Sequence, residues 1–204
     1  NFAGWSAIIG KLYTGEIFHD YARCAKAIIK ENKITGQNFV FYYGHTKLGA
    51  EGADFDNGPS DDLGGLHGFR RMVDTLHKHG IRIMLLDHLH RWINRDVTEY
   101  RRLGLERFAV RDSSGALSTA RWWKETGLSS LYFRGPTPEW VEMCPSCRGW
   151  REHYFRHLKR MIRLGVDALE IDTFLPSVCH SKNHPHKPGA NIIQAKLDFF
   201  REAR

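Results

Sequence analysis

The feature that most constrains the fold of this 204-residue chain is a pattern that occurs twice: a helix, a glycine, a short buried strand and an aspartate. In one copy, Gly80 and Asp87 bracket a β-prone run. In the other, Gly165 and Asp172 bracket a second such run at the same spacing. Glycine commonly ends a helix, and an α/β barrel presents acidic groups at the ends of its strands. We therefore expect repeated strand-and-helix units with acids at one end of a sheet.

The rest of the chain continues this alternation. Apolar residues at helical spacing predict helices over residues 20–32, 65–79, 150–164 and 191–204. Apolar β-prone runs predict strands over residues 37–44, 81–87 and 166–172, with the end of an earlier strand at residues 2–5. Strands and helices that alternate in this way form a parallel sheet with right-handed crossovers.

The loops are unequal in length, and this favours one α/β architecture over another. Those after the predicted strands are long (45–62, 88–149 and 173–189), whereas those after the helices are short. An α/β barrel builds its active site from its strand-to-helix loops. A doubly wound open sheet is the alternative, but no Gly-rich phosphate-binding loop follows a predicted strand. The predicted fold class is α/β, a partial TIM (β/α)8 barrel with about the first four β/α units.

Chain length sets the expected extent of this barrel. A closed barrel of eight strands takes about 250 residues, while 204 residues with 42% hydrophobic side chains suffice for one core. We expect a single catalytic-barrel domain over residues 1–204, truncated at both ends. It would begin inside strand 1 and end in helix 4, so that strand 4 leads into Asp172.

The charge and hydropathy of the chain argue against two classes of partner. The net charge of +7 could indicate nucleic-acid binding. The basic residues are scattered along the polar faces of predicted helices, in pairs such as Arg70-Arg71 and Arg101-Arg102. No apolar run approaches the roughly 18 residues of a membrane span. We expect neither nucleic acid nor a membrane as a partner; the oligomeric state and the compartment stay open.

Asp172 is the candidate catalytic residue. It closes a predicted strand at the end where barrels place their catalytic groups. Because side chains alternate along a strand, Glu170 and Asp172 should both point into the barrel. Two inward acids are costly unless they serve a site or find a partner. A structural or helix-capping role for Asp172 is the alternative.

Two carboxylates would suffice for glycosidic bond cleavage. They stand about 5–5.5 Å apart in retaining enzymes and about 6.5–9.5 Å apart in inverting ones. Asp172 suits the nucleophile or base, and the missing half of the barrel could supply the acid. Polar residues after the strands are candidates for binding sugar hydroxyls: Asp54, Asp56, Asp87, His88, His184 and His186. Asp54 and Asp56 could equally be solvated turn residues, because Asp and Gly favour turns.

The four cysteines leave several chemistries open. Cys144 and Cys147 form a Cys-x2-Cys motif, and Cys179 precedes His184 and His186. Such a set is compatible with tetrahedral zinc, but one Cys-x2-Cys motif also fits a disulfide or free thiols. We therefore predict no metal and no cofactor. A zinc-binding module built on the three cysteines and a nearby histidine is kept as an alternative.

Several motifs follow one another along the chain: Gly4-Trp5, Leu63-Gly64-Gly65, Leu76-His77-Lys78-His79-Gly80, Met143-Cys144-Pro145 with Trp150, the run from Gly165 to Asp172, and Cys179 with His184-Pro185-His186-Lys187-Pro188-Gly189. Their order resembles a family of largely uncharacterised glycoside-hydrolase-like barrels related to the alpha-galactosidase clan. Two departures from that family concern sugar specificity. Glu170 stands where the family more often has an aromatic residue, and His184-Pro185-His186 replaces a His-Gly-His pattern.

The resemblance implies a (β/α)8 barrel that cleaves glycosidic bonds. In that clan the nucleophile follows strand 4, where Asp172 falls, and the acid/base follows strand 6, which we expect to lie outside this chain. We therefore predict a carbohydrate substrate and a retaining mechanism with a glycosyl-enzyme intermediate on Asp172, in a fragment inactive on its own. The alternative is a non-catalytic or degenerate barrel that binds carbohydrate without cleaving it.

Overall fold

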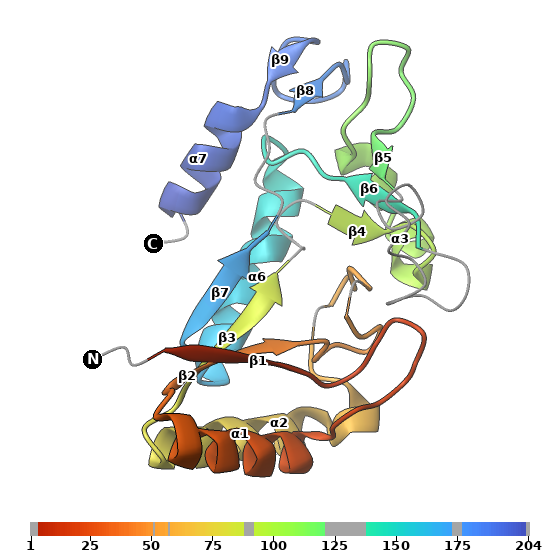
Figure 1. Cartoon of the computed structure of the whole chain (residues 1–204). Coiled ribbons are helices and arrows are strands. Elements are labelled where there is room, and N and C mark those ends of the chain that lie inside the picture. Colours follow the sequence, from red (N-terminus) through yellow and green to blue (C-terminus); the bar gives the residue numbers. More distant parts are fainter. Residues whose placement is uncertain are drawn as a thin grey trace.

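The computed structural model describes residues 4–50, 52–56, 58–87, 92–120, 138–172 and 177–202. At its centre is a four-stranded parallel sheet in the order β1-β2-β3-β7 (Figure 1). The strands are Trp5–Ile9, Phe39–Tyr43, Arg82–Asp87 and Ala168–Ile171. Neighbouring strands in the sheet follow one another in this order along the chain, and each pair is parallel. Their carboxyl ends therefore lie at one edge of the sheet.

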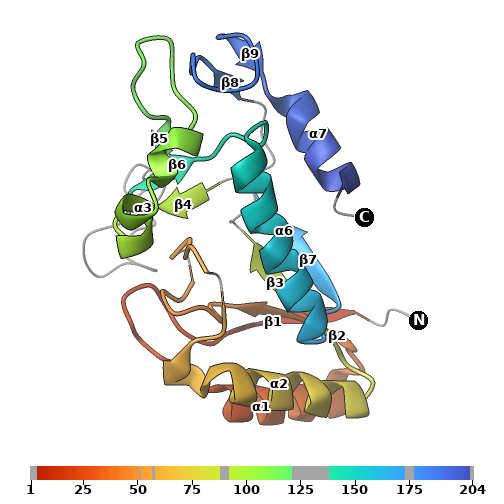
Figure 2. The same ribbon diagram turned by 180° about the vertical axis from the view of Figure 1, so that it is seen from behind.

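Three helices connect or follow these strands and share one face of the sheet: α1 (Tyr21–Thr35), α2 (Gly65–Lys78) and α6 (Arg148–Arg163). Helices α1 and α2 lie side by side, and α6 runs along β3 and β7 (Figures 1 and 2). The Asp20 side chain caps α1 by accepting from the Arg23 amide at 2.7 Å. Gly80 and Gly165 have φ of 71° and 85°, a left-handed conformation that glycine adopts without strain. The two glycine stops that the sequence predicts are therefore present.

The main hydrophobic core fills the space between this face and the helices. Ile83 and Leu85 of β3 pack there with Phe69 of α2 and Met161 of α6, and Leu169 of β7 lies against them. Side chains of a strand alternate between its two faces. The residues of β3 and β7 in between, Met84 among them, therefore point to the opposite face of the sheet.

A second, smaller structure lies beyond the carboxyl ends of β3 and β7 (Figure 1). It contains an antiparallel sheet in the order β4-β6-β5 and a two-stranded hairpin of β8 and β9. Its elements are β4 (Trp92–Asn94), α3 (Thr98–Arg102), η2 (Leu105–Phe108), β5 (Thr119–Ala120), β6 (Trp140–Glu142), β8 (Val178–Cys179) and β9 (Ala190–Asn191). A second core, to which Trp150 and Tyr154 contribute, packs this structure against α6.

The last helix, α7 (Ile193–Glu202), is held by a buried polar network. Lys196 Nζ lies 3.3 Å from Glu142 Oε1, and both side chains are less than 5% exposed. Ser177 Oγ donates to Glu142 Oε1 at 2.6 Å, and Ser118 Oγ donates to Oε2 at 3.0 Å. The network therefore joins α7, β6 and the segment before β8.

The predicted α/β class and the parallel sheet are confirmed, and the predicted helices and later strands agree with the observed ones to within a few residues. The first strand was placed wrongly: residues 2–5 were expected to contain its end, whereas β1 begins at Trp5 and ends at Ile9. Residues 88–149 and 173–189 are predicted as strand-to-helix loops, and within them the structure also contains the short strands β4, β5, β6 and β8. Strands of two or three residues are too short to produce a detectable period.

Two further observations complete the fold. An isolated 3₁₀ turn, η1 (Asp61–Leu63), leads into α2. Within the described parts of the chain, no helix combines the length and the apolar character needed to cross a bilayer.

Candidate functional site

Asp172 is the first residue after β7, at the edge where the parallel strands end. Ile171 pairs in register with Asp87 of β3, so the two strands end side by side. Leu169 packs against the core beneath the helices, so strand alternation directs Glu170 and Asp172 to the opposite face. Burial, followed by the charge of Asp172, raises the pKa of the Glu170 carboxyl. The two acids are therefore electrostatic neighbours on one face.

Asp87 closes β3 on the helix-covered face, in line with Ile83, and its side chain is fully buried. Tyr154 of α6 donates its hydroxyl to Asp87 Oδ2 at 2.6 Å, and His157 Nε2 lies 3.8 Å from Oδ1. This carboxylate therefore joins β3 to α6. The predicted binding of a sugar hydroxyl by Asp87 stays a prediction. The same holds for His88, which lies outside the described residues.

The loops that follow β1, β2 and β3 together line a polar cavity of about 560 Å³, here called the acidic cavity. Six carboxyl groups line it: Asp54, Asp56, Asp61, Asp62, Asp96 and Glu99. Tyr13, Lys47 and Asn94 also contribute to the wall. Ligand pockets of small molecules typically measure about 300–1,000 Å³. The acidic cavity therefore has the size and the hydrogen-bonding groups that a sugar unit requires.

Asp54 and Asp56 lie in this cavity in different environments. Burial raises the pKa of Asp54, whose Oδ1 accepts from the Asp56 amide at 3.3 Å. Asp56 is exposed, and its Oδ1 pairs with Arg160 Nη1 of α6 at 2.6 Å. Neither Asp172 nor Asp87 belongs to the cavity lining. The structure therefore brings Asp54 and Asp56 together but does not place them around the predicted nucleophile.

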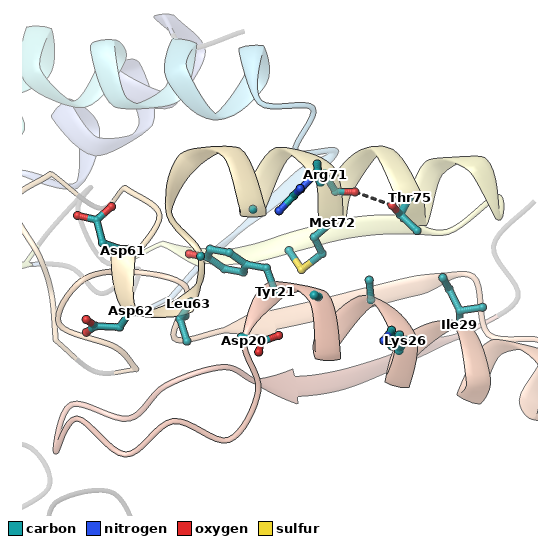
Figure 3. A pocket seen from close by; sticks show the side chains of 14 residues that line it. Asp20, Tyr21, Lys26, Ile29, Asp61, Asp62, Leu63, Arg71, Met72 and Thr75 are labelled. Carbon is teal, nitrogen blue, oxygen red and sulfur yellow. Dashed lines mark hydrogen bonds between the residues drawn. The ribbon is translucent and has the colours of Figure 1, made fainter.

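A further cavity, of about 640 Å³, lies between α1 and α2 (Figure 3). Tyr21, Ile29 and Met72 supply apolar wall, and Asp61 and Asp62 lie at one end of it. Its lining comes from the two helices and the segments that precede them, and it contains none of the predicted site residues. It lies away from the strand ends, so it is not a candidate for the predicted chemistry.

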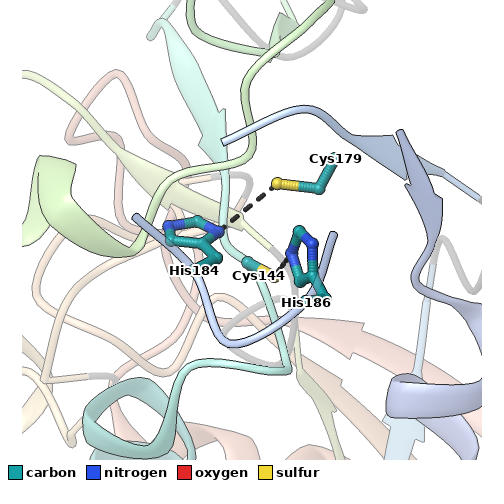
Figure 4. Close-up of side chains that lie close together, drawn as sticks. All are labelled: Cys144, Cys179, His184 and His186. Atoms are coloured by element: carbon teal, nitrogen blue, oxygen red, sulfur yellow. Dashed lines mark hydrogen bonds between the residues drawn. The ribbon is translucent and has the colours of Figure 1, made fainter. Parts of the chain in front are cut away.

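Four side chains converge in the second structure to form what we call the Cys/His cluster: Cys144, Cys179, His184 and His186 (Figure 4). One potential ligand atom from each lies within 4.8 Å of the others. Cys144, Cys179 and His184 are buried, and His186 is half-buried. The prediction that the two histidines bind sugar is not tested by this arrangement.

The expected zinc alternative was partly wrong in its choice of cysteines. Cys147 is not a member of the cluster, although it is separated from Cys144 by only two residues. It occupies the N-cap position of α6, and its amide donates to the Cys144 carbonyl at 3.1 Å. Its side chain packs in the second core, to which Cys144 and Cys179 also belong, but its sulfur is not grouped with the ligand atoms of the cluster. All four cysteines of the chain are free thiols, so the disulfide alternative is not what the structure shows.

Similarity to known structures defines the class of fold. The alpha-N-acetylgalactosaminidase NagBb from Bifidobacterium bifidum, in complex with GalNAc, has a TM-score of 0.75 at 13% identity over 98% of this chain and 32% of that one. The maltogenic alpha-amylase AmyB from Thermotoga neapolitana has a TM-score of 0.63 at 15% identity over 98% and 41%. The galactosidase domain of the alpha-galactosidase-sucrose kinase AgaSK gives 0.62 at 12% identity over 98% and 24%. The fold is therefore glycoside-hydrolase-like.

This chain belongs to the family described as "Domain of unknown function (DUF6259)", whose model matches residues 24–192. The chain spans about a third of the length of the solved structures that it first matches. No curated protein matches its sequence. Membership of this family does not by itself assign an activity.

Proposed function

We propose that this chain forms part of the catalytic barrel of a retaining glycoside hydrolase, with Asp172 as the nucleophile. The observation that carries the proposal is the position of Asp172, directly after the fourth strand of a parallel sheet. It lies on the face opposite the helices, at the strand end where α/β barrels hold catalytic groups. The likeness in fold to solved glycosidases supports the class of enzyme.

We further propose that the sheet is the first half of a (β/α)8 barrel. Four parallel strands in chain order are half of the strands that such a barrel contains. Further β/α units would complete the barrel and cover the outer edges of β1 and β7. They would also supply the second catalytic acid, which the resemblance to the alpha-galactosidase clan assigns to strand 6.

The mechanism follows from a nucleophile at this position. An Asp172 carboxylate oxygen attacks the anomeric carbon while the second acid protonates the departing glycosidic oxygen, leaving a glycosyl-enzyme ester. The second acid, now deprotonated, then acts as a base toward a water molecule, and this water cleaves the ester with net retention. Glu170 does not need to take part. Burial, followed by the charge of Asp172, raises the pKa of its carboxyl.

The acidic cavity supplies the proposed sugar subsite. Asp54 and Asp56 would each accept hydrogen bonds from sugar hydroxyls. For His88, which follows β3 in the sequence, sugar binding is proposed from its position in the sequence alone. Asp87 is fully buried and lies outside the cavity lining, so it would support the site only indirectly, by fixing the end of β3 to α6 through Tyr154.

His184 and His186 were also predicted to bind sugar, but their surroundings support a different role. Both imidazoles lie within hydrogen-bond distance of a cysteine sulfur. A sugar ligand would have to displace these contacts.

The proposal is tested with the full-length protein and a panel of aryl α-galactosides, α-N-acetylgalactosaminides and α-glucosides. Asp172→Gly should lower kcat by about a thousandfold or more, because the covalent step is lost. Added azide should restore turnover and yield a glycosyl azide of inverted configuration. Asp74→Asn, on the exposed face of α2, should leave kcat unchanged. A wild-type protein that binds these sugars but hydrolyses none would instead establish the degenerate barrel.

A further inference from the structure

We propose that Cys144, Cys179, His184 and His186 bind one zinc ion in a closed structural site. The site is independent of the proposed glycosidase activity, because its four ligands lie in the second structure and do not include Asp172. Two thiolates and two imidazoles are a donor set that zinc prefers, and four protein ligands complete its tetrahedron.

The distances in the cluster agree with a tetrahedral ion. Cys144 Sγ lies 3.4 Å from His186 Nε2, and Cys179 Sγ lies 3.4 Å from His184 Nδ1. With Zn–S of about 2.3 Å and Zn–N of about 2.0–2.1 Å, sulfur and nitrogen ligands of one tetrahedral zinc lie about 3.5 Å apart. The four ligand atoms need only small shifts to surround an ion.

The second nitrogen of each imidazole is held as it is in metal sites. His184 Nε2 lies 3.0 Å from the Arg107 carbonyl oxygen, and His186 Nδ1 lies 3.0 Å from the Lys187 carbonyl oxygen. A carbonyl oxygen can only accept, so these nitrogens carry the protons. The nitrogens that face the sulfurs are then free of protons in the neutral imidazoles. Metal-binding histidines almost always donate their other N–H in this way.

The charge of the metal-bound site is compatible with its burial. An uncompensated charge in the protein interior would be costly. Zn²⁺ with two thiolates and two neutral imidazoles has no net charge. Cys144 and Cys179 are both fully buried, so this balance matters at their position.

The ligands come from two segments that are distant in the sequence. Cys144 lies between β6 and α6, whereas the other three ligands belong to the β8–β9 hairpin. Backbone hydrogen bonds already position the hairpin: the His180 amide donates to the Arg111 carbonyl at 2.8 Å, and the Gly189 amide donates to the Cys179 carbonyl at 2.9 Å. A zinc ion would therefore fix the hairpin to the start of α6. It would also exclude both histidines from sugar binding.

The first test is elemental analysis of this chain, purified under reducing conditions and reconstituted with zinc. We expect one zinc per chain. Replacement by Co²⁺ should give the near-ultraviolet thiolate-to-cobalt band and the intense visible bands of tetrahedral coordination. A chain that stays free of metal after this treatment would overturn the proposal, as would cobalt spectra without a thiolate band. Neither readout depends on glycosidase activity.

Variants then test the identity of the ligands. Cys179→Ser and His186→Ala should each reduce bound zinc to well below one per chain after a chelator wash. Cys147→Ser is the matched control, because Cys147 is also buried and lies outside the cluster. Zinc lost from Cys147→Ser but kept in the two ligand variants would overturn the assignment. If a ligand variant does not fold, cysteine alkylation of the wild type decides. Labelling is done in moderate urea, where burial alone no longer protects the thiols. Bound zinc should slow the labelling of Cys144 and Cys179 relative to Cys147, and equal rates with and without zinc under these conditions would contradict the site.

Discussion

The hydroxyl of Tyr154 donates to the carboxylate of Asp87 at 2.6 Å, in the interior between α6 and the carboxyl end of β3. Tyr154→Phe keeps the ring, which packs against Phe199 with centroids 4.7 Å apart. It removes only the hydrogen bond to a buried charged group, which stabilises by about 1.5–3 kcal/mol. We expect the free energy of unfolding in urea to fall by about that amount.

Tyr100→Phe is the control for this prediction. Tyr100 is also buried, but its hydroxyl has no hydrogen-bond partner among the described residues. Its loss removes a buried hydroxyl that lacks a partner, so Tyr100→Phe should leave the unfolding free energy unchanged or raise it. Equal effects of the two substitutions would show that the Asp87 contact does not contribute specifically.

The buried pair of Lys196 and Glu142 should be sensitive to loss of one partner. Lys196→Met leaves the Glu142 carboxylate buried with two serine hydroxyls and without its cation. Breaking a buried ion pair in this way costs about 3–5 kcal/mol. Thermal or urea unfolding should show this loss, and the double variant Glu142→Gln/Lys196→Met should recover much of it.

The same helix provides the comparison for the ion pair. Arg201 and Asp198 of α7 form an exposed pair at 2.9 Å, with side chains 69% and 52% exposed. Arg201→Met should cost no more than about 1 kcal/mol, because exposed pairs contribute little. A Lys196→Met variant as stable as Arg201→Met would be incompatible with a stabilising role for the buried network.

His157 should make stability depend on pH. Burial, followed by the nearby His45, His153 and Arg160, lowers the pKa of His157 from 6.5 to about 3. Asp87, 3.8 Å away, acts in the opposite direction, but burial dominates. Between these pKa values the unfolded chain binds the proton and the folded chain does not. The contribution of His157 to the free energy of unfolding is therefore complete above pH 6.5 and is lost as the pH falls toward 3.

Urea unfolding at pH 7 and pH 5.5 measures this effect. As the pH falls, the free energy of unfolding of the wild type should decrease by up to about 1.4 kcal/mol per pH unit more than that of His157→Gln. His67→Gln replaces an exposed histidine of α2 and should behave like the wild type. If His157→Gln and the wild type show the same pH dependence, His157 is not the group responsible.

The main sheet could be predicted from the sequence because its elements follow local rules. Helix periodicity, the glycine stops at Gly80 and Gly165, and the apolar strand runs each depend on neighbouring residues. The side of β3 on which Asp87 lies could not be assigned. β3 carries apolar side chains on both faces, so their alternation along the strand does not indicate which face packs against α6.

The Cys/His cluster shows why part of the site escaped sequence analysis. Cys144 and Cys147 form a Cys-x2-Cys motif, which is typical of paired metal ligands. In the structure Cys147 is the N-cap of α6, and only Cys144 belongs to the cluster. The sequence feature that indicates this cluster is the grouping of Cys179, His184 and His186 in one loop. Which cysteine joins them depends on packing between distant segments, and no local pattern encodes that.

The central claim is that Asp172 is a glycosidase nucleophile, and covalent trapping tests it most directly. The full-length protein would be incubated with 5-fluoroglycosyl fluorides of the galactose, N-acetylgalactosamine and glucose series, digested with protease, and examined by tandem mass spectrometry. We predict one glycosyl adduct, located on Asp172 and absent from Asp172→Asn. An adduct on Asp54, Asp56, Glu170 or another carboxylate, with Asp172 unmodified, would contradict this assignment.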